Sequence, residues 1–389
     1  MLDLSSKLPA TGVTIFSQMS ALAQQLGALN VSQGFPDFTP PQALLEALAQ
    51  ATLDGHNQYA PGDGLLNLRQ AVAAQFHKRD AIHLDPINEI TITPGASIGI
   101  FASIQALVHT GDEVIMFDPS YDCYDPAVRL VGAKPIHIAL QQPDFSMDWN
   151  QVKDAINDRT RMIIVNTPHN PSGAIWSKAD WQQLIELIQD KNIVVLSDEV
   201  YEHLVFDGKA HHSALSFPEL RKRSIVLGSF GKTFHVTGWK TGYCAASPQL
   251  MQLFRQVYQY ANFCGVTPVQ VALTQFMQNH PEHIAELADF YQAKRDLFNS
   301  QIVDSRFQIR ASQGTYFQNL DYSQIHPELH DVEMCHYLAH AHKVVAIPIS
   351  VFYETAPTDL RLIRICFAKK IRPCTKQVRF YDRSKSDLK

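Results

Sequence analysis

The chain contains 389 residues, of which 46% are hydrophobic and 18% are charged, and its formal net charge is −5. This length predicts about two domains of roughly 100–200 residues each, and the composition is that of a globular protein. The negative net charge gives no electrostatic reason to expect a nucleic acid partner. No run reaches the roughly 18 apolar residues of a membrane helix, so no membrane partner is expected either.

The amino terminus and the cysteines bear on the compartment. Residues 1–10 lack a basic stretch followed by an apolar one, so no signal peptide is expected. The six cysteines are scattered and form no CxxC pair, which favours a reducing, cytoplasmic location over a disulfide framework. His336 and His340 have the spacing of one helix face, but there is no HExxH motif and no accompanying carboxylate, so no metal is expected.

Short apolar, β-branched runs alternate with helical stretches as far as about residue 280. Runs of this length suit strands that are buried on both faces, as in a parallel sheet. Two predicted helices, Ala96–His109 and Lys178–Gln189, lie between such runs, and Ser177 is the predicted N-cap of the second. This alternation predicts an α/β layered domain. The predicted strands are Glu89–Thr93, Glu113–Phe117, Arg161–Asn166, Asn192–Ser197, Ser224–Gly228 and Thr241–Ala246.

The chain from about residue 281 has a different pattern, typical of a smaller α+β domain. The last 19 residues, Ile371–Lys389, hold six Lys or Arg and few apolar side chains, so we expect them to be poorly ordered, with a basic docking arm as the alternative. The predicted helices before this tail are Pro281–Ser300 and Val332–Ala341, and the predicted strands are Phe307–Ala311, Thr315–Asp321, Val344–Ile347 and Leu360–Phe367.

Polar segments follow five successive predicted strands of the first domain. In open parallel sheets, ligands bind beyond the carboxyl ends of the strands. Each segment alone is more often a turn or a helix cap, but the five together, in this order, indicate a binding site. The segments are Gly95-Ala96-Ser97, Asp118-Pro119-Ser120-Tyr121, the NTPHNPSG block at 166–173, Asp198-Glu199-Val200-Tyr201 and Ser229-Phe230-Gly231-Lys232-Thr233.

The first and last of these segments suit the phosphate of a cofactor such as pyridoxal 5′-phosphate (PLP). A helix that begins at Ala96-Ser97 offers free backbone N–H groups and a hydroxyl to a phosphate dianion. Ser229 and Lys240 can add a hydroxyl and a positive charge. The ring of Tyr121 can stack on a flat heterocycle.

The remaining segments suit the ring and the reactive carbon of the same cofactor. Asp198 ends an apolar run, where a carboxylate is costly unless it is paired, and a protonated pyridine nitrogen would pair it. Tyr201 and Asn170 can hydrogen-bond to a phenolate oxygen. Lys232 can form an imine, because a lysine that is buried near other cations has a lowered pKa and becomes a nucleophile.

The segment Gly231-Lys232-Thr233 also resembles the end of a phosphate-binding Walker A loop, GxxxxGK[ST]. That motif requires glycine at position 226, where this chain has Val226, and Gly228 lies two positions away. The spacing therefore excludes a nucleotide hydrolase of this type.

With these residues in order, the chain resembles the fold-type I PLP-dependent aminotransferases, and within them the methionine aminotransferase and kynurenine aminotransferase (glutamine transaminase K) group. The resemblance covers roughly residues 8–370. It implies a large domain at 41–280, with a mostly parallel seven-stranded sheet between helices, and a smaller α+β domain formed by 1–40 and 281–370. The motifs are Asn30–Phe38, Asn57–Pro61, NTPHNPSG at 166–173, SDEVYEHL at 197–204, SFGKTFHVTGWKTGY at 229–243, GTYF at 314–317 and Leu362–Phe367.

The resemblance implies roles for the residues that hold the cofactor. Lys232 matches the Schiff-base lysine, and Asp198 matches the partner of the pyridine nitrogen. Asn170 and Tyr201 match the groups at the phenolic oxygen. Tyr59 matches a tyrosine that reaches the phosphate of the neighbouring subunit, which implies a homodimer with shared active sites. The other matched cofactor contacts are Gly95, Ala96, Ser97, Tyr121, Ser229 and Lys240.

The resemblance also implies the substrates. Arg364 matches the arginine that binds the substrate α-carboxylate, and the backbone N–H of Gly34 lies where it would join that grip. Phe16, Phe35 and Phe263 are candidate walls of the side-chain pocket, with core packing as the alternative for each.

The implied activity is ping-pong transamination between an apolar or aromatic L-amino acid and a 2-oxo acid. Methionine is favoured as the donor, with Phe, Tyr, Trp, kynurenine and glutamine as further candidates. A PLP-dependent β-lyase acting on cysteine conjugates at the same site is the alternative. A non-enzymatic regulator is disfavoured because Lys232 and Arg364 are intact. Two regions depart from the family: residues after 370 lack its terminal amphipathic helix, and Lys134–His137 matches loosely and carries no predicted chemistry.

Overall fold

The computed structural model describes residue 2, residues 4–8 and residues 12–370, so the predicted tail at 371–389 lies outside the described residues. The first half of the chain contains α1 (Ile15–Leu26), β1 (Leu29–Asn30), α2 (Gln42–Leu53), α3 (Leu66–Asp80), β2 (Ile90–Thr93), α4 (Ala96–Leu107), β3 (Glu113–Asp118), α5 (Tyr124–Leu130), β4 (Lys134–Ala139), α6 (Trp149–Ala155), β5 (Thr160–Asn166), α7 (Lys178–Ile188) and β6 (Val194–Asp198). The second half contains η1 (Ala214–Ser216), α8 (Pro218–Arg221), β7 (Ser224–Ser229), α9 (Phe230–Thr233), η2 (Thr237–Trp239), β8 (Gly242–Ala246), α10 (Pro248–Ala261), α11 (Thr267–Asn279), α12 (Glu282–Ile302), β9 (Gln308–Ile309), β10 (Phe317–Asp321), α13 (Asp331–Tyr337), η3 (Leu338–His342), β11 (Val344–Val345), β12 (Ile347–Pro348), η4 (Ser350–Phe352) and β13 (Leu362–Cys366).

The large sheet has seven strands in the order β2-β8-β7-β6-β5-β3-β4. Only β8 runs antiparallel to its neighbours, β2 and β7. The predicted α/β fold with a mostly parallel seven-stranded sheet is therefore confirmed. The edge strand β4 was not predicted, because it contains Pro135 and half-exposed residues; proline is tolerated in an edge strand, where an N–H can go unpaired.

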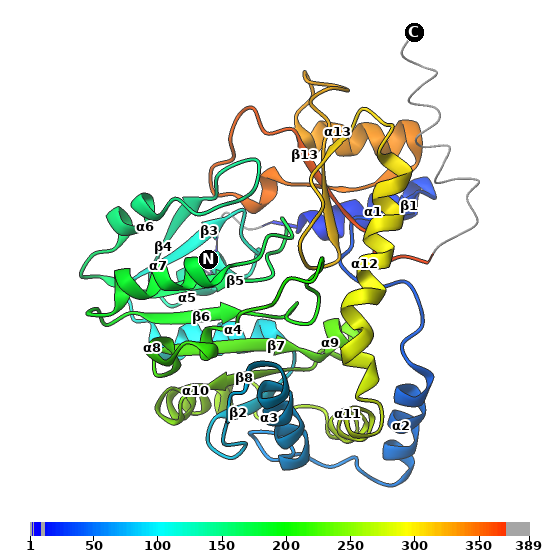
Figure 1. The fold of residues 1–389 in the computed structure, drawn as a ribbon. Coiled ribbons are helices and arrows are strands. Elements are labelled where there is room, and N and C mark those ends of the chain that lie inside the picture. The colour runs from blue at the N-terminus through cyan, green and yellow to red at the C-terminus, as the bar shows by residue number, and fades with distance from the viewer. Residues whose placement is uncertain (1, 3, 9–11, 371–389) are drawn as a thin grey trace.

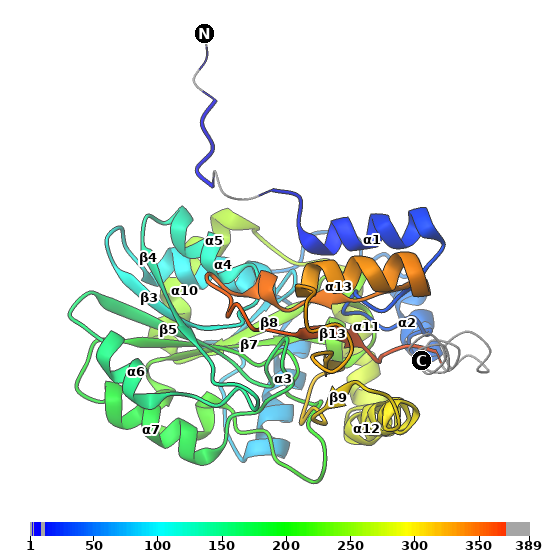
Figure 2. The same ribbon diagram turned by 90° about the horizontal axis from the view of Figure 1, so that it is seen from above.

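Helices cover both faces of this sheet (Figures 1 and 2). Along β3, Val114 and Met116 pack into one core with residues of α4, α5 and α10. The alternate residues Ile115 and Phe117 pack into a second core with residues of α3, α7 and α11. This alternation is the two-residue period of a strand that is buried on both faces, and it explains why the strands appear as continuous apolar runs in the sequence.

The remaining strands form a four-stranded antiparallel sheet, β12-β13-β10-β9, and a parallel pair, β1-β11. Helices α1, α12 and α13 lie beside them (Figure 1). The predicted strand Val344–Ile347 is divided between two sheets, since β11 pairs with β1 and β12 pairs with β13. The core of this region also contains Tyr201, Leu204 and Phe206, which follow β6, so the domain boundaries at 40/41 and 280/281 stay a prediction.

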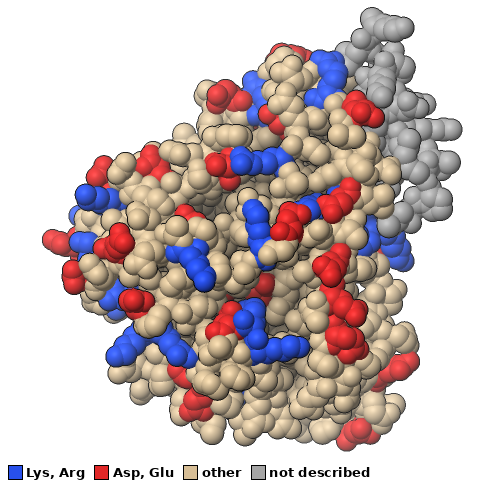
Figure 3. Space-filling model, in the orientation of Figure 1, with Lys and Arg blue, Asp and Glu red and all other residues tan. Residues whose placement is uncertain are grey.

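The described surface is of mixed charge. On the face in Figure 3, acidic and basic side chains are interspersed over most of the area. In the described part of the chain, no helix combines the length and apolar character that crossing a membrane requires.

Candidate active site

A cavity of about 180 Å³ lies at the carboxyl ends of β5, β6 and β7, next to the start of α4. The wall contains every predicted cofactor-binding residue of this chain except Tyr59, so the fold brings together segments that are up to about 140 residues apart in the sequence. The lining residues are Gly95, Ala96, Ser97, Ile100, Tyr121, Asn166, Asn170, Asp198, Val200, Tyr201, Ser229, Gly231, Lys232, Thr237, Lys240 and Thr241.

The end of the cavity at α4 has the features of a phosphate cradle. Helix α4 begins at Ala96, and Gly95 before it has φ +79°, a conformation that favours glycine. The ammonium of Lys240 lies alongside, since a Cβ added to Gly95 would be 3.5 Å from Lys240 Nζ. Free N–H groups at a helix start and a nearby cation suit a phosphate dianion, so these residues fit the phosphate of PLP.

The carboxylate of Asp198 lies at the end of β6 and is 4% exposed. Its Oδ2 accepts a hydrogen bond from the Tyr124 hydroxyl at 2.6 Å, and its Oδ1 accepts one from the Val200 N–H at 3.3 Å. Burial raises the pKa of Asp198 to about 6, although the Tyr124 hydrogen bond and the charge of Lys232 oppose the rise. A protonated pyridine nitrogen would supply the close cationic partner that this carboxylate needs to stay ionised.

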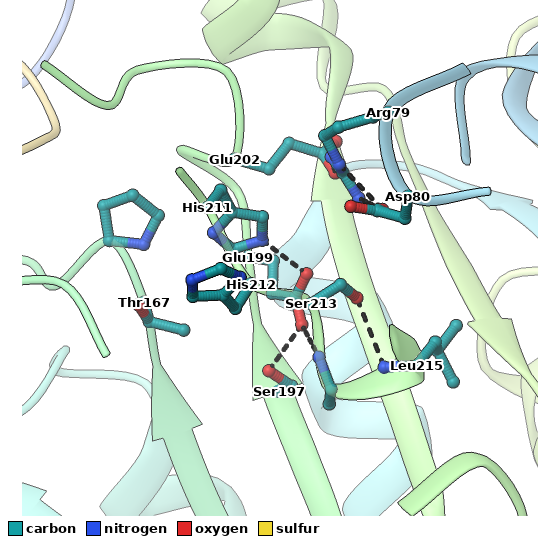
Figure 4. Close-up of polar contacts among 12 residues, drawn as sticks. Arg79, Asp80, Thr167, Ser197, Glu199, Glu202, His211, His212, Ser213 and Leu215 are labelled. Atoms are coloured by element: carbon teal, nitrogen blue, oxygen red, sulfur yellow. Dashed lines mark hydrogen bonds and ion pairs between the residues drawn. The ribbon is translucent and has the colours of Figure 1, made fainter. Parts of the chain in front are cut away.

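The neighbouring carboxylate, Glu199, is not part of the cavity wall and lies in a polar cluster with Ser197 and His211 (Figure 4). Its Oε1 accepts hydrogen bonds from Ser197 Oγ at 2.8 Å and from the Ala214 N–H at 2.9 Å, and its Oε2 lies 2.8 Å from His211 Nε2. The Glu199 side chain is fully buried. Its contacts therefore tie the residues next to Asp198 to Ser197, His211 and Ala214.

The amine of Lys232 lies on α9 and faces the second region of the chain. Its Nζ donates to Tyr316 Oη at 2.9 Å and to the Gly34 carbonyl at 3.3 Å. Burial lowers the pKa of Lys232 to about 8, and the charges of Arg364 and Lys240 add to this effect. A pKa in this range leaves a useful fraction of neutral, nucleophilic amine near neutral pH.

The guanidinium of Arg364 lies on β13 and is 1% exposed. Its Nη1 donates to Asn170 Oδ1 at 2.7 Å and its Nη2 donates to the Ser32 carbonyl at 3.0 Å, whereas its Nε has no partner among the described residues. Burial lowers the pKa of Arg364 to about 10. A buried cation that is bonded only to neutral oxygens, with an N–H to spare, suits a carboxylate ligand.

Aromatic rings surround this arginine. The Arg364 guanidinium carbon lies 4.0 Å from the ring centre of Phe317, 5.2 Å from that of Phe352 and 5.6 Å from that of Phe16. Of the three candidate walls, Phe16 therefore lies beside the predicted substrate arginine. Phe35 is 41% exposed, and its role as a wall stays a prediction.

Tyr59 lies outside the cavity of its own chain. It is 83% exposed, in the loop between α2 and α3, and its ring contacts that of Phe263 edge-on at 5.3 Å. Phe263 is likewise 41% exposed, so its role as a wall also stays a prediction. Both residues are available to a second subunit.

Three further residues shape the site and were not among the predicted site residues. Asn166 links two motif loops, since its Nδ2 donates to the Asp198 carbonyl at 2.8 Å and its Oδ1 accepts from the Asn170 N–H at 2.8 Å. Tyr124 binds Asp198, and Tyr316 binds Lys232. Asn166 and Tyr316 lie within the motifs that carry the family resemblance. Tyr124 lies outside them, and its one signal in the sequence is its position three residues after Tyr121.

The chain is similar to known proteins over most of its length. The family model "Aminotransferase class I and II" matches residues 27–372. Methionine aminotransferase of Escherichia coli is 48% identical over 365 residues, with 94% of each chain covered, and human kynurenine–oxoglutarate transaminase 3 is 33% identical, with 92% of this chain and 85% of that protein covered.

Solved structures are similar over almost the whole chain. An Escherichia coli structure with methionine aminotransferase function matches with a TM-score of 0.95 and 46% identity, covering 99% of this chain and 100% of that one. The N-succinyldiaminopimelate aminotransferase of Mycobacterium tuberculosis matches with a TM-score of 0.91 and 34% identity, covering 98% of both. The chain therefore belongs to the class I and II aminotransferases, a family that depends on pyridoxal 5′-phosphate.

Proposed function

We propose that this chain is a homodimeric aminotransferase that moves the amino group of an apolar or aromatic L-amino acid, with methionine as the favoured donor, to a 2-oxo acid. The observation that carries the proposal is the placement of three buried charged groups around one region: the Lys232 amine, the Asp198 carboxylate and the Arg364 guanidinium. All three have pKa values shifted toward the neutral form by burial. Each therefore gains from the opposite charge or covalent partner that a cofactor and substrate bring.

Different residues of the cavity suit different parts of the cofactor. The start of α4, Ser229 and Lys240 would hold the phosphate, Tyr121 would stack on the ring, and Asp198 would pair with the pyridine nitrogen and keep it protonated. When bound, PLP supplies an electron sink for the α-carbon of the attached amino acid. The negative charge of Asp198 would favour the protonated form of the pyridine nitrogen, and this protonation strengthens the electron sink. The other predicted contacts are Gly95, Ala96, Ser97, Asn170 and Tyr201.

Lys232 is the group that handles the proton. Its Nζ would hold the cofactor, and the same amine in its neutral form would take up and return the proton of the substrate α-carbon. The hydroxyl of Tyr316 accepts a hydrogen bond from Nζ at 2.9 Å and would hold this amine in position. The same amine serves both halves of a ping-pong cycle, because each half needs the same proton transfer in the opposite direction.

Arg364 orients the amino acid and the oxo acid alike, since both carry an α-carboxylate. Fixing that carboxylate holds the α-carbon next to Lys232, and positioning of this kind contributes much of an enzyme's rate. The rings of Phe16, Phe317 and Phe352 around Arg364 support an apolar or aromatic side chain in the substrate. The methionine and kynurenine aminotransferases among the relatives support the same substrate class.

The exposed pair Tyr59 and Phe263 supports a homodimer in which Tyr59 reaches the partner's cofactor phosphate. A cytoplasmic location is supported by the five free cysteines of the described residues, Cys123, Cys244, Cys264, Cys335 and Cys366.

The test is spectroscopic and then chemical. Purified protein mixed with PLP is expected to develop an absorbance band at the violet edge of the visible range, which borohydride fixes covalently. Lys232→Ala is expected to lose the fixation, whereas the exposed-lysine control Lys209→Ala retains it. A protein that stays colourless with PLP would contradict the proposal. A panel of amino donors with one oxo-acid acceptor then identifies the substrate, and release of pyruvate and ammonia from a cysteine conjugate would instead identify a β-lyase.

A further inference from the structure

His137, which had no predicted chemistry, lies between two carboxylates on the edge strand β4. Its Nδ1 is 2.8 Å from Asp118 Oδ1 and its Nε2 is 3.0 Å from Asp125 Oδ2. Both ring nitrogens are therefore used in polar contacts. The side chain is 13% exposed, so these contacts are largely shielded from water.

The two carboxylates bracket the loop that borders the cofactor cavity. Asp118 ends β3, and Asp125 lies in the first turn of α5. Between them are Tyr121, which lines the cavity, and Tyr124, whose hydroxyl donates to Asp198. By binding both ends of this loop, the imidazole of His137 fixes the position of the two tyrosines.

The same carboxylates also hold the segment that follows η4 in the second region of the chain. Asp118 Oδ2 accepts a hydrogen bond from the Glu354 N–H at 2.8 Å. Arg129 binds Asp125 Oδ1 at 2.6 Å and reaches Glu354 Oε1 at 3.3 Å. The ring of contacts thus runs from β4 through β3 and α5 to Glu354.

Helix η4, directly before this segment, carries Phe352, one of the rings around the predicted substrate arginine. The Phe352 carbonyl accepts a hydrogen bond from the Ser120 N–H at 2.7 Å, and the Phe352 ring lies 5.2 Å from the Arg364 guanidinium carbon. One network therefore connects the loop beside the cofactor ring with the rings beside the substrate carboxylate.

The charges in the network are complementary. Burial alone would lower the pKa of His137, but hydrogen bonds to Asp118 and Asp125 outweigh it and raise the pKa to about 9. The imidazole is thus a cation at neutral pH, and its contacts are charge-assisted. Asp125, His137 and Glu354 are close enough to share a metal ion, but the guanidinium of Arg129 already binds both carboxylates, so the group is satisfied without one.

We propose that His137 is a positioning residue that keeps the loop carrying Tyr121 and Tyr124 in register with the segment carrying Phe352. The cofactor ring and the substrate carboxylate then stay at a fixed separation. This inference rests on the proposed aminotransferase function, because its consequence is measured on substrate binding and turnover.

The decisive variant is His137→Gln, which cannot bridge two carboxylates with a charged ring. The KM for the amino donor is expected to rise roughly fivefold to tenfold, with a smaller fall in kcat, because misplacement weakens the fit of a substrate held at both ends. Glu354→Gln removes only the outer contact with Arg129, so a rise of about twofold is expected. A merely structural role would reduce the fraction of folded protein and leave the KM of the remainder unchanged.

The matched control is His326→Gln. His326 also binds a glutamate, Glu328, at 3.0 Å, but this pair does not belong to the network around His137. Its KM is expected to equal that of the wild type.

A double variant, His137→Gln with Glu354→Gln, is expected to behave like His137→Gln alone, because both changes break one connected network. A wild-type KM in His137→Gln, or strictly multiplicative effects in the double variant, would overturn the inference. If His137→Gln does not fold, an unchanged KM in Glu354→Gln decides against it. Failure of the proposed function is distinct, since the wild type itself would then not transaminate.

Discussion

Two buried carboxylates follow one another at the end of β6, and they belong to differently built regions. Around Asp198, burial outweighs the available partners: the pKa of this aspartate rises to about 6, that of Lys232 falls to about 8 and that of Arg364 falls to about 10. Around Glu199, the partners are complete, with two hydrogen-bond donors on one oxygen and His211 on the other.

Glu202, on the same side as Glu199, shows the consequence. Burial alone would raise the pKa of Glu202, but the charge of Arg79 and a hydrogen bond from Tyr243 lower it to about 2. Glu202 therefore stays ionised in the folded protein, and its ion pair with Arg79 joins α3 to the segment that follows β6. Buried charges with incomplete partners cost stability, and at a cavity they indicate where a ligand supplies what is missing.

The largest expected effect on activity comes from Arg364, in the region where buried charges have incomplete partners. Arg364→Gln removes the charge that is proposed to bind the α-carboxylate, so kcat/KM should fall roughly 100-fold, mainly through KM, as expected for the loss of a charge-assisted pair. The control is Arg361→Gln, since the partners of Arg361 in the described part of the chain are the carbonyls of Pro327, Thr358 and Leu360. Steady-state kinetics with one donor and one acceptor measure both. An unchanged KM in Arg364→Gln would remove Arg364 from the site.

A smaller effect separates the two neighbouring carboxylates. Glu199→Ala leaves the donors of Ser197, Ala214 and His211 without an acceptor, so the free energy of unfolding should fall by about 2–4 kcal/mol. Asp198→Asn keeps the shape and removes a costly charge, so its free energy of unfolding should stay within about 1 kcal/mol of the wild type.

Urea unfolding of the cofactor-free protein measures both changes. Equal losses of stability in Glu199→Ala and Asp198→Asn would end the distinction between the two regions. The affinity for PLP is expected to show the reverse order, with Asp198→Asn as the weaker binder.

The smallest expected effect is the pH dependence contributed by His137. Its pKa is about 9 in the folded state and near 6.5 when unfolded, so the folded protein binds the proton more tightly. The stabilisation is therefore complete below about pH 6.5 and is lost as the pH rises through about 9. Allowing for solvent screening of a partly exposed group, it amounts to about 1–2 kcal/mol. The difference in unfolding free energy between wild type and His137→Gln should shrink between pH 6 and 9.5, and a constant difference would contradict this.

The parts of the fold that the sequence predicts are those governed by local patterns. Continuous apolar runs mark strands that are buried on both faces, and Ser177, the predicted N-cap, is confirmed as the cap of α7. Edge strand β4 was not predicted. It pairs with one strand, β3, so its apolar pattern is weaker and Pro135 is tolerated. The division of Val344–Ile347 between two sheets was not predicted either. Both halves are apolar, and they differ in the strands with which they pair.

The site shows the same limit. The cavity wall follows from the rule that ligands bind at the carboxyl ends of parallel strands, so Asp198 and Lys232 are predictable from their positions after β6 and β7. The contacts that join distant segments are not. Nothing local in the sequence relates Tyr124 to Asp198 or His137 to Asp118, because these contacts depend on how neighbouring strands are ordered in the sheet.

The bond from Arg364 to the Ser32 carbonyl joins residues that are 332 positions apart. At roughly 5–20 residues per second, a ribosome needs on the order of 20–60 s to pass from one to the other. Within that interval the strands around the cavity are synthesised first. The partner of the Ser32 carbonyl, Arg364, is synthesised last. The strands around the cavity are therefore complete well before the segment that carries Arg364, and a chain that ends before β13 (Leu362–Cys366) would lack this arginine.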